Sequence, residues 1–161
     1  MIKSIMQYAS TVWSSCDKND MGRVFKLQKR AARVICYAHN QASSVHLFNK
    51  LNWIPLYEEI KIAKCCIVYK RINNNVPAYI EDSLKLNNQV HSRNTRYCNS
   101  NLICAKYNRK TEGGRTFSVT TSQLWNALSL NLRNANSSTV FKNNYREILF
   151  KIQQDLRHFI I

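Results

Sequence analysis

The amino-acid sequence predicts a mainly α-helical protein, and three observations support this fold class. The 161 residues include only three glycines and two prolines, so few positions interrupt the chain, which favours long helices over a many-stranded sandwich. Apolar residues recur at helical spacing in several long segments. Hydrophobic residues make up 45% of the sequence, with three Trp, eight Tyr and six Phe, which is enough to bury a core.

The first part of the chain has a clear helical pattern. Asp17 can cap a helix that we predict at about residues 18–38. A second, short helix is predicted from Ser44 to Asn52. The apolar residues that repeat at helical spacing in the first helix are Val24, Leu27, Ala31, Val34 and Ile35.

Two prolines mark the starts of further helices. Pro55 suits the first turn of a helix over Leu56–Ile72, and Pro77 suits that of a short helix extending to Leu86. The Leu56–Ile72 helix is apolar around most of its circumference, so we expect it to pack centrally. The narrow polar stripe that remains on it consists of Lys61, Lys64 and Arg71.

The helical pattern fades after residue 86, where Asn and Ser accumulate. We predict short strands at Leu102–Tyr107 and Thr116–Val119, joined across Gly113-Gly114. The result is an irregular or two-stranded β segment near 100–119, which needs support from helices beneath it.

Helical patterning returns near the end of the chain. We predict a helix over Thr120–Leu128 and a final helix at about 138–159, which Ser137 or Ser138 can cap. The expected organisation is therefore a helical region at 1–86, a basic irregular linker or ribbon at 87–119, and a C-terminal helical region at 120–161.

The charge balance points to a polyanionic partner. Lys and Arg number 24 against 9 Asp and Glu, a formal net charge of +15, and such an excess favours binding to nucleic acid or another polyanion. No apolar run is long enough to span a membrane, and the first residues lack the apolar block of a signal peptide. We therefore expect an intracellular protein, nuclear or cytoplasmic, with no membrane partner and six reduced cysteines.

The sequence offers little for catalysis. No nucleophile elbow or caspase-type cysteine signature is present. His91, Cys98 and Cys104 are the nearest zinc candidates, but they lack the closely spaced cysteine pair of structural sites. The adjacent carboxylates Glu58-Glu59 and Glu81-Asp82 stand at predicted helix starts, where the helix dipole accounts for them. We expect no enzyme activity, no metal site and no cofactor.

Basic residues are the remaining signal, and they form two groups. In the 18–38 helix, four of them fall on one side of the helical wheel, where they either track a phosphate backbone or form an ordinary solvated face. They are Arg23, Lys26, Arg30 and Arg33.

The second group lies in the 87–116 segment, among aromatic residues that can stack on unpaired bases. The alternative is a surface loop whose aromatics face inward. Nucleic-acid contact is favoured because arginine outnumbers lysine, and guanidinium planes suit both phosphates and bases. The basic residues are Arg93, Arg96, Lys106, Arg109, Lys110 and Arg115, and the aromatic ones are Tyr97, Tyr107 and Phe117.

Several short word-like stretches occur in order along the chain. They are Tyr8–Trp13, Leu27–Ile35, Leu51–Leu56, His91–Arg96, Phe117-Ser118, Leu124–Leu128 and Phe141-Lys142. Together they resemble the C-terminal region of reverse transcriptases from jockey-like non-LTR retrotransposons. The resemblance extends from about Tyr8 to Leu149, and several ordered motifs are more specific than any one of them. One departure is Ser129, where the family commonly has proline after Trp-Asn-x-Leu.

The resemblance implies a fragment of an RNA-directed DNA polymerase. In that family this region follows the palm and supplies a helical thumb and an extension, while the catalytic aspartates sit in a paired motif on the palm. This sequence contains no Asp-Asp pair. The resemblance therefore implies a thumb-like bundle that binds template RNA or a primer duplex through phosphates, and that has the palm of the parent polymerase as a further partner.

Three other interpretations remain open. The chain is a non-functional relic of a decayed element, a basic RNA- or DNA-binding module reused by the host, or a stand-alone enzyme whose site the sequence does not reveal. Cooperative unfolding of a stable monomer favours the reused module over the relic.

Overall fold

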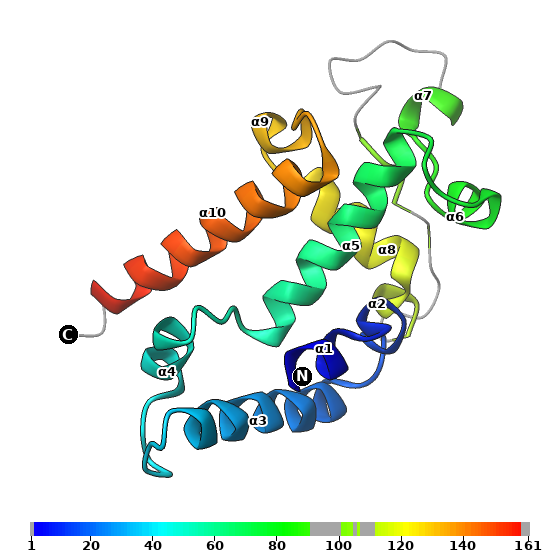
Figure 1. Cartoon of the computed structure of the whole chain (residues 1–161). Coiled ribbons are helices and arrows are strands. Elements are labelled where there is room, and N and C mark those ends of the chain that lie inside the picture. Colours follow the sequence, from blue (N-terminus) through cyan, green and yellow to red (C-terminus); the bar gives the residue numbers. More distant parts are fainter. Residues whose placement is uncertain (1, 91–100, 105, 107–111, 159–161) are drawn as a thin grey trace. The chain divides into compact units, whose positions relative to one another are not determined.

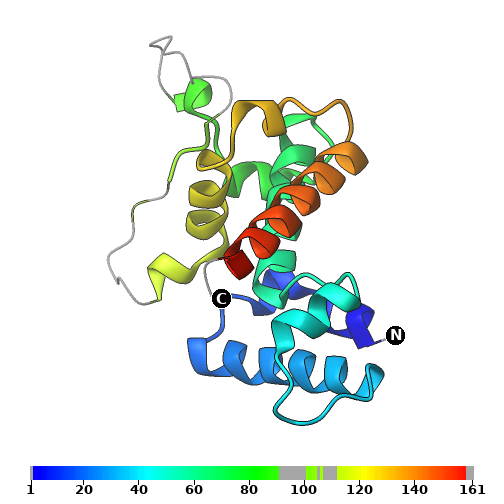
Figure 2. The same cartoon turned by 90° about the vertical axis from the view of Figure 1, so that its left-hand side faces the viewer.

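The computed structural model describes residues 2–90, 101–104, 106 and 112–158. These residues are mainly helical, as the sequence predicts (Figures 1 and 2). The elements are α1 (Ile2–Gln7), α2 (Ser10–Trp13), α3 (Lys18–Ile35), α4 (Ser44–Lys50), α5 (Leu56–Ile72), α6 (Ala78–Ser83), α7 (Asn87–Val90), the 3₁₀ turn η1 (Gly113–Arg115), α8 (Phe117–Asn126), α9 (Leu130–Arg133) and α10 (Ser138–His158).

The chain forms two compact units. Unit 1 comprises Met1–Ile60 and Arg146–Ile161, and unit 2 comprises Lys61–Tyr145. The division falls inside α5 and inside α10, so both helices contribute to both units. Unit 1 combines residues from the two ends of the chain, whereas unit 2 is continuous in sequence.

Unit 1 is built around the buried side of α3. Met21 packs with Leu56 and Ile60 of α5 in one buried cluster. Ala32 packs with two residues of α4, Leu47 and Phe48, in a second. Phe25 of α3 borders both clusters, and its ring meets that of Phe48 edge-on at 6.2 Å between centroids. One face of α3 therefore holds the N-terminal part of the chain together.

Unit 2 has an aromatic core. Phe141 of α10 is fully buried. Its ring centroid lies 5.2 Å from that of Tyr69 of α5 in a stacked arrangement and 5.8 Å from that of Trp125 of α8. The Tyr69 hydroxyl donates to the carbonyl of Ala135 at 2.5 Å. Three helices thus bury large side chains against each other, and each such side chain contributes roughly 1.5–3 kcal/mol.

Helices α3, α4 and α5 end in the same local motif. Each is followed by a residue in the left-handed region, Tyr37 (φ 51°), Asn52 (φ 51°) and Asn74 (φ 53°). In each case the next amide donates back to the last turn, for example Ala38 to the Arg33 carbonyl at 2.9 Å, as in a Schellman motif. This motif ends α3 at Ile35, three residues before the predicted end.

The other predicted helices are present with small changes at their ends. The Leu56–Ile72 helix has the predicted bounds, and α10 ends one residue before the predicted position. The Ser137 side chain accepts a hydrogen bond from the Val140 amide at 3.2 Å, so Ser137 is the cap. Asp17 occupies the N-cap position of α3, although its side chain makes no capping hydrogen bond. Helix α6, Ala78–Ser83, stops before the predicted Leu86.

The predicted two-stranded ribbon is wrong in its second half. Residues 117–119 belong to α8, and Gly113–Arg115 form a 3₁₀ turn rather than a hairpin turn. The run of β-branched residues at 119–121 suits a strand locally, but Val119, Ser122 and Trp125 are buried at helical spacing, and tertiary packing overrides such a preference. In the first half, Leu102 forms only an isolated antiparallel bridge with Leu86, while residues 105 and 107 lie outside the described residues.

Candidate nucleic-acid interface

The first predicted basic group lies on the solvent side of α3. Arg23, Lys26 and Arg30 are all exposed. The guanidinium of Arg23 lies 3.5 Å from the carboxylate of Asp20, and both side chains are largely in water, at 82% and 59% exposure. A pair with these exposures holds the arginine weakly, by about 1 kcal/mol or less.

The spacing of these three cations suits a nucleic-acid backbone. A helix rises about 1.5 Å per residue, so residues 23, 26 and 30 are separated by about 4.5 and 6 Å along the axis. One strand of a B-form duplex carries a phosphate about every 3.4 Å along its axis. The three side chains therefore extend over about three phosphate-to-phosphate steps of one strand.

Arg33, the fourth member of the group, is placed differently. It is half-buried, and its Nη2 donates to the carbonyl of Ala42 in the loop between α3 and α4 at 3.4 Å. Its Nε is buried and has no hydrogen-bond partner among the described residues. This arginine fixes the loop against α3 and is less accessible to a phosphate than the other three.

Most of the apolar residues that signal α3 in the sequence lie outside its buried side, although Val24 packs against the Met21 cluster. Leu27 is 52% exposed, Val34 73% and Ile35 43%. The buried side instead carries Met21, Gln28 and Ala32. Gln28 is accommodated there because its amide nitrogen donates to the Ile54 carbonyl at 3.0 Å and its oxygen accepts from the Leu56 amide at 2.8 Å.

The second predicted basic group is mostly outside the described residues, as are Tyr97 and Tyr107. Of the members that the structure describes, Lys106 is exposed, while Arg115 is half-buried in η1. Phe117 is half-buried at the start of α8. The members outside the described residues are Arg93, Arg96, Arg109 and Lys110.

The residues on either side of the segment 91–100 are paired with each other in unit 2. The amide of Asn87 donates to the carbonyl of Asn101 at 3.0 Å, and that of Ile103 donates to the carbonyl of Lys85 at 2.9 Å. Together with the bridge between Leu86 and Leu102, these bonds form a clamp, residues 85–87 against 101–103. The chain therefore enters and leaves this segment at one place.

Two side chains that the sequence analysis did not select support the clamp from α8 and α9. The side chain of Asn126 accepts from the Leu102 amide at 3.0 Å and donates to the Leu102 carbonyl at 2.8 Å, as a neighbouring strand would. Arg133 donates to the Asn101 side chain at 2.7 Å and to the Asn126 carbonyl at 2.6 Å. The Trp-Asn pair at 125–126 was the sequence signal that could have identified Asn126, because Trp125 is buried in the core next to it.

Two basic residues of α5, expected to form its polar stripe, are buried in unit 2. Arg71 is 4% exposed and donates to the Leu84 carbonyl and to the Gln89 side chain, each at 3.0 Å. Lys64, also 4% exposed, donates to the Thr120 hydroxyl at 3.0 Å. Burial lowers the pKa of Lys64. Both cations therefore make hydrogen bonds inside unit 2, and neither is accessible to a polyanion in solution.

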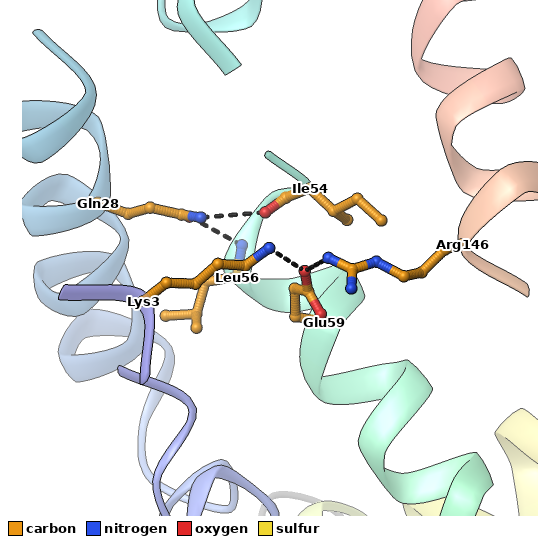
Figure 3. A network of polar contacts seen from close by, with 6 residues as sticks. All are labelled: Lys3, Gln28, Ile54, Leu56, Glu59 and Arg146. Carbon is orange, nitrogen blue, oxygen red and sulfur yellow. Dashed lines mark hydrogen bonds and ion pairs between the residues drawn. The ribbon is translucent and has the colours of Figure 1, made fainter. Parts of the chain in front are cut away.

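A buried ion-pair network fixes the ends of the chain within unit 1 (Figure 3). Glu59, in the first turn of α5, is 6% exposed. Its Oε1 accepts from Lys3 of α1 at 2.8 Å and from Arg146 of α10 at 2.6 Å. The helix dipole alone was expected to account for the pair Glu58-Glu59; in fact Glu59 is also neutralised by two cations from distant parts of the sequence.

A small hollow beside this network does not have the size of a ligand site. Lys3, Trp53 and Glu59 are among the residues that line it. Its space measures about 240 Å³, including the part open to solvent, whereas small-molecule sites begin at roughly 300 Å³.

The cysteines and acidic residues show no assembled chemical site in the part of the chain that the structure describes. Burial, and secondarily the neighbouring Cys66, raises the pKa of the Cys65 thiol to about 12, and burial also raises the pKa of Cys66. No group of three metal-ligating side chains occurs among the described residues. Cys104 is exposed, while His91 and Cys98, the other two residues considered with it for zinc, lie outside the described residues.

None of the helices formed by the described residues combines the length and the apolar character that a membrane crossing requires. Comparison of the chain with protein-family models, with curated proteins and with solved structures found no match.

Proposed function

We propose that this chain is the thumb-like C-terminal region of a retrotransposon RNA-directed DNA polymerase, and that its α3 helix holds nucleic acid through backbone phosphates. The observation that supports this most strongly is the exposure of Arg23, Lys26 and Arg30 along one side of one helix. The formal charge of +15 supplies the wider attraction for a polyanion. The ordered motifs that resemble those of the retrotransposon family support the assignment of the chain to that family.

Such an interface positions nucleic acid without reading its sequence. Binding of this kind releases counterions, so the logarithm of affinity falls with the logarithm of salt concentration by about 0.9 per phosphate contact on duplex DNA. Three contacts then predict a slope near −2.7, or about a fortyfold loss of affinity between 50 and 200 mM salt. The role is template–primer binding; in this proposal the polymerisation chemistry belongs to the palm of the parent enzyme.

A salt titration with matched variants tests the proposal. The probe is a fluorescent 20-nucleotide RNA–DNA hybrid, and its affinity is measured by anisotropy at several salt concentrations. We expect the variant with Arg23, Lys26 and Arg30 replaced by Ala to lose two to three units of slope. The control removes the same charge from exposed positions outside α3, at Lys50, Lys70 and Lys85.

The control should keep most of the wild-type slope. If both triple variants lose the same slope, attraction is spread over the whole surface and α3 is no interface. If neither variant changes binding, the basic face of α3 is merely solvated.

A second function, an independent nucleic-acid-binding module reused by a host, is supported by the packing. Each unit has buried apolar residues of its own, such as Met21 and Leu56 in unit 1 and Trp125 and Phe141 in unit 2. A chain with such cores is equipped to fold without a palm. Cooperative urea unfolding of the purified monomer supports the reused module, whereas aggregation without a partner supports a fragment that depends on its parent.

A further inference from the structure

Helix α3 has an exposed apolar stripe that the proposed phosphate contacts do not use. Leu27 and Val34 are 52% and 73% exposed; Ala31 lies between them in sequence and next to them on the helical wheel, on the side nearer the buried residues. The stripe therefore lies beside the buried side of the helix, which carries Met21, Gln28 and Ala32.

The spacing of this stripe matches that of a helix–helix seam. Residues 27, 31 and 34 follow one another at intervals of four and three, which are the d, a and d positions of a heptad. Ala31 is small, so a partner backbone can approach closely between the two larger side chains. A second helix laid along α3 therefore finds a short seam about 10 Å long, from seven residues at about 1.5 Å each.

Charges border this seam on one side only. In the same heptad, Arg23 and Arg30 occupy the two g positions, which in coiled coils select the partner by charge. The corresponding e positions are Gln28, which is buried, and Ile35, which is apolar. The charged residues that can select a partner helix are therefore only the two arginines, so this edge of the seam is basic.

This edge disfavours a second copy of the chain. Two α3 helices packed antiparallel bring Arg23 and Arg30 of one copy against the same residues of the other. Parallel packing sets each arginine against Gln28 or Ile35, neither of which is acidic. The formal charge of +15 on each chain adds general repulsion.

We propose that this face of α3 docks one acidic amphipathic helix of another protein. The apolar seam of that helix packs on Leu27, Ala31 and Val34, and its glutamates or aspartates pair with Arg23 and Arg30. The contact is small, so the complex is weak and transient. This function goes beyond nucleic-acid binding, and because both ligands use Arg23 and Arg30, the acidic helix and a phosphate backbone compete for α3.

Synthetic helices and the full chain test the proposal. The probe is a fluorescent 21-residue peptide with Leu at a and d and Glu at e and g; the comparison peptide has Lys in place of Glu. We expect the Glu peptide to bind at least tenfold more tightly than the Lys peptide. Replacing Leu27 and Val34 by Gln should weaken the Glu peptide at least tenfold, because the loss of two apolar contacts is worth about this much.

The matched control replaces two other exposed residues of unit 1, Val12 and Val45, by Gln, and should leave binding within twofold. Replacing Arg23 and Arg30 by Glu should reverse the peptide preference. Binding of the RNA–DNA hybrid should be unchanged by the Gln variant of the seam, which separates this proposal from the phosphate interface.

Five results overturn the proposal. The first three are equal binding of both peptides, equal binding of wild type and the seam variant, and an equal loss in the control. The fourth is dimerisation of the chain alone that the seam variant abolishes, which assigns the stripe to a second copy. The fifth is a loss of hybrid binding in the seam variant, which makes the stripe part of the nucleic-acid interface.

Discussion

Replacing Glu59 by Gln tests the energetic role of the buried network in unit 1. The substitution keeps the size and shape of the side chain but removes the charge that Lys3 and Arg146 share. Both cations then stay near a neutral amide, whose oxygen still accepts hydrogen bonds but carries no charge to attract them. We expect unit 1 to lose stability without losing its fold.

The magnitude follows from the exposure of the three side chains. A hydrogen bond to a charged group contributes roughly 1.5–3 kcal/mol when buried, and an exposed ion pair contributes about 1 kcal/mol or less. The Glu59 side chain is 6% exposed while Lys3 and Arg146 are 28% exposed, so the cations can recover some hydration. Each contact then accounts for about 1 kcal/mol, and Glu59→Gln should lower the free energy of unfolding by about 2 kcal/mol.

Urea unfolding followed by tryptophan fluorescence measures this loss, with Trp13 and Trp53 reporting on unit 1. A double-mutant cycle with Arg146→Met should give a coupling of about 1 kcal/mol. The matched control is Asp20→Asn, which removes the charge of an exposed pair and should change stability by less than about 0.5 kcal/mol. A loss of this smaller size in Glu59→Gln would show that the network adds nothing beyond a surface pair.

Three further predictions concern unit 2. Asn126→Ala removes both hydrogen bonds to the buried Leu102 backbone and should cost about 2 kcal/mol in urea unfolding; a cost below about 0.5 kcal/mol contradicts the role of this amide. Cys65, with its pKa near 12, should resist iodoacetamide at pH 8 in the folded chain while Cys104 reacts. Because that pKa is raised in the folded state, the Cys65 contribution to stability is complete below about pH 9 and lost as the pH rises toward 12, which unfolding at several pH values checks. Lys64→Met should be neutral or stabilising by about 1 kcal/mol, since it removes a desolvated cation, and a loss above about 2 kcal/mol contradicts this.

Local signals predicted most helix ends. Pro55 and the asparagines after Ile72 define α5 because proline suits a helix start and asparagine tolerates the left-handed conformation found at Asn74. Ser137 caps α10 through its own side chain. These features depend on residues within one turn of the helix end, so a short stretch of sequence is enough to predict them.

Local sequence patterns could not predict contacts between residues that are far apart in the sequence. Glu59 and Arg146 are 87 positions apart, and no local pattern identifies them as partners. Gln28 is buried because it satisfies the backbone at Ile54 and Leu56, whereas apolar Val34 stays exposed, so hydrophobicity alone chose the wrong side of α3. The predicted basic face retains three exposed members, and its binding to nucleic acid stays a prediction.

Because residues 85–87 are clamped against 101–103, the number of residues between the two sides of the clamp can vary at little cost. Once the ends of a loop are held by the fold, doubling the number of residues between them costs only about 0.6 kcal/mol of closure entropy. The bonds from Asn126 and Arg133 that support the clamp come from outside this segment. Insertions, deletions or a grafted recognition peptide between Val90 and Asn101, which spare the Gln89 contact with Arg71, should therefore leave the helical core of unit 2 unchanged, and this position is the natural place for the protein to acquire new specificity.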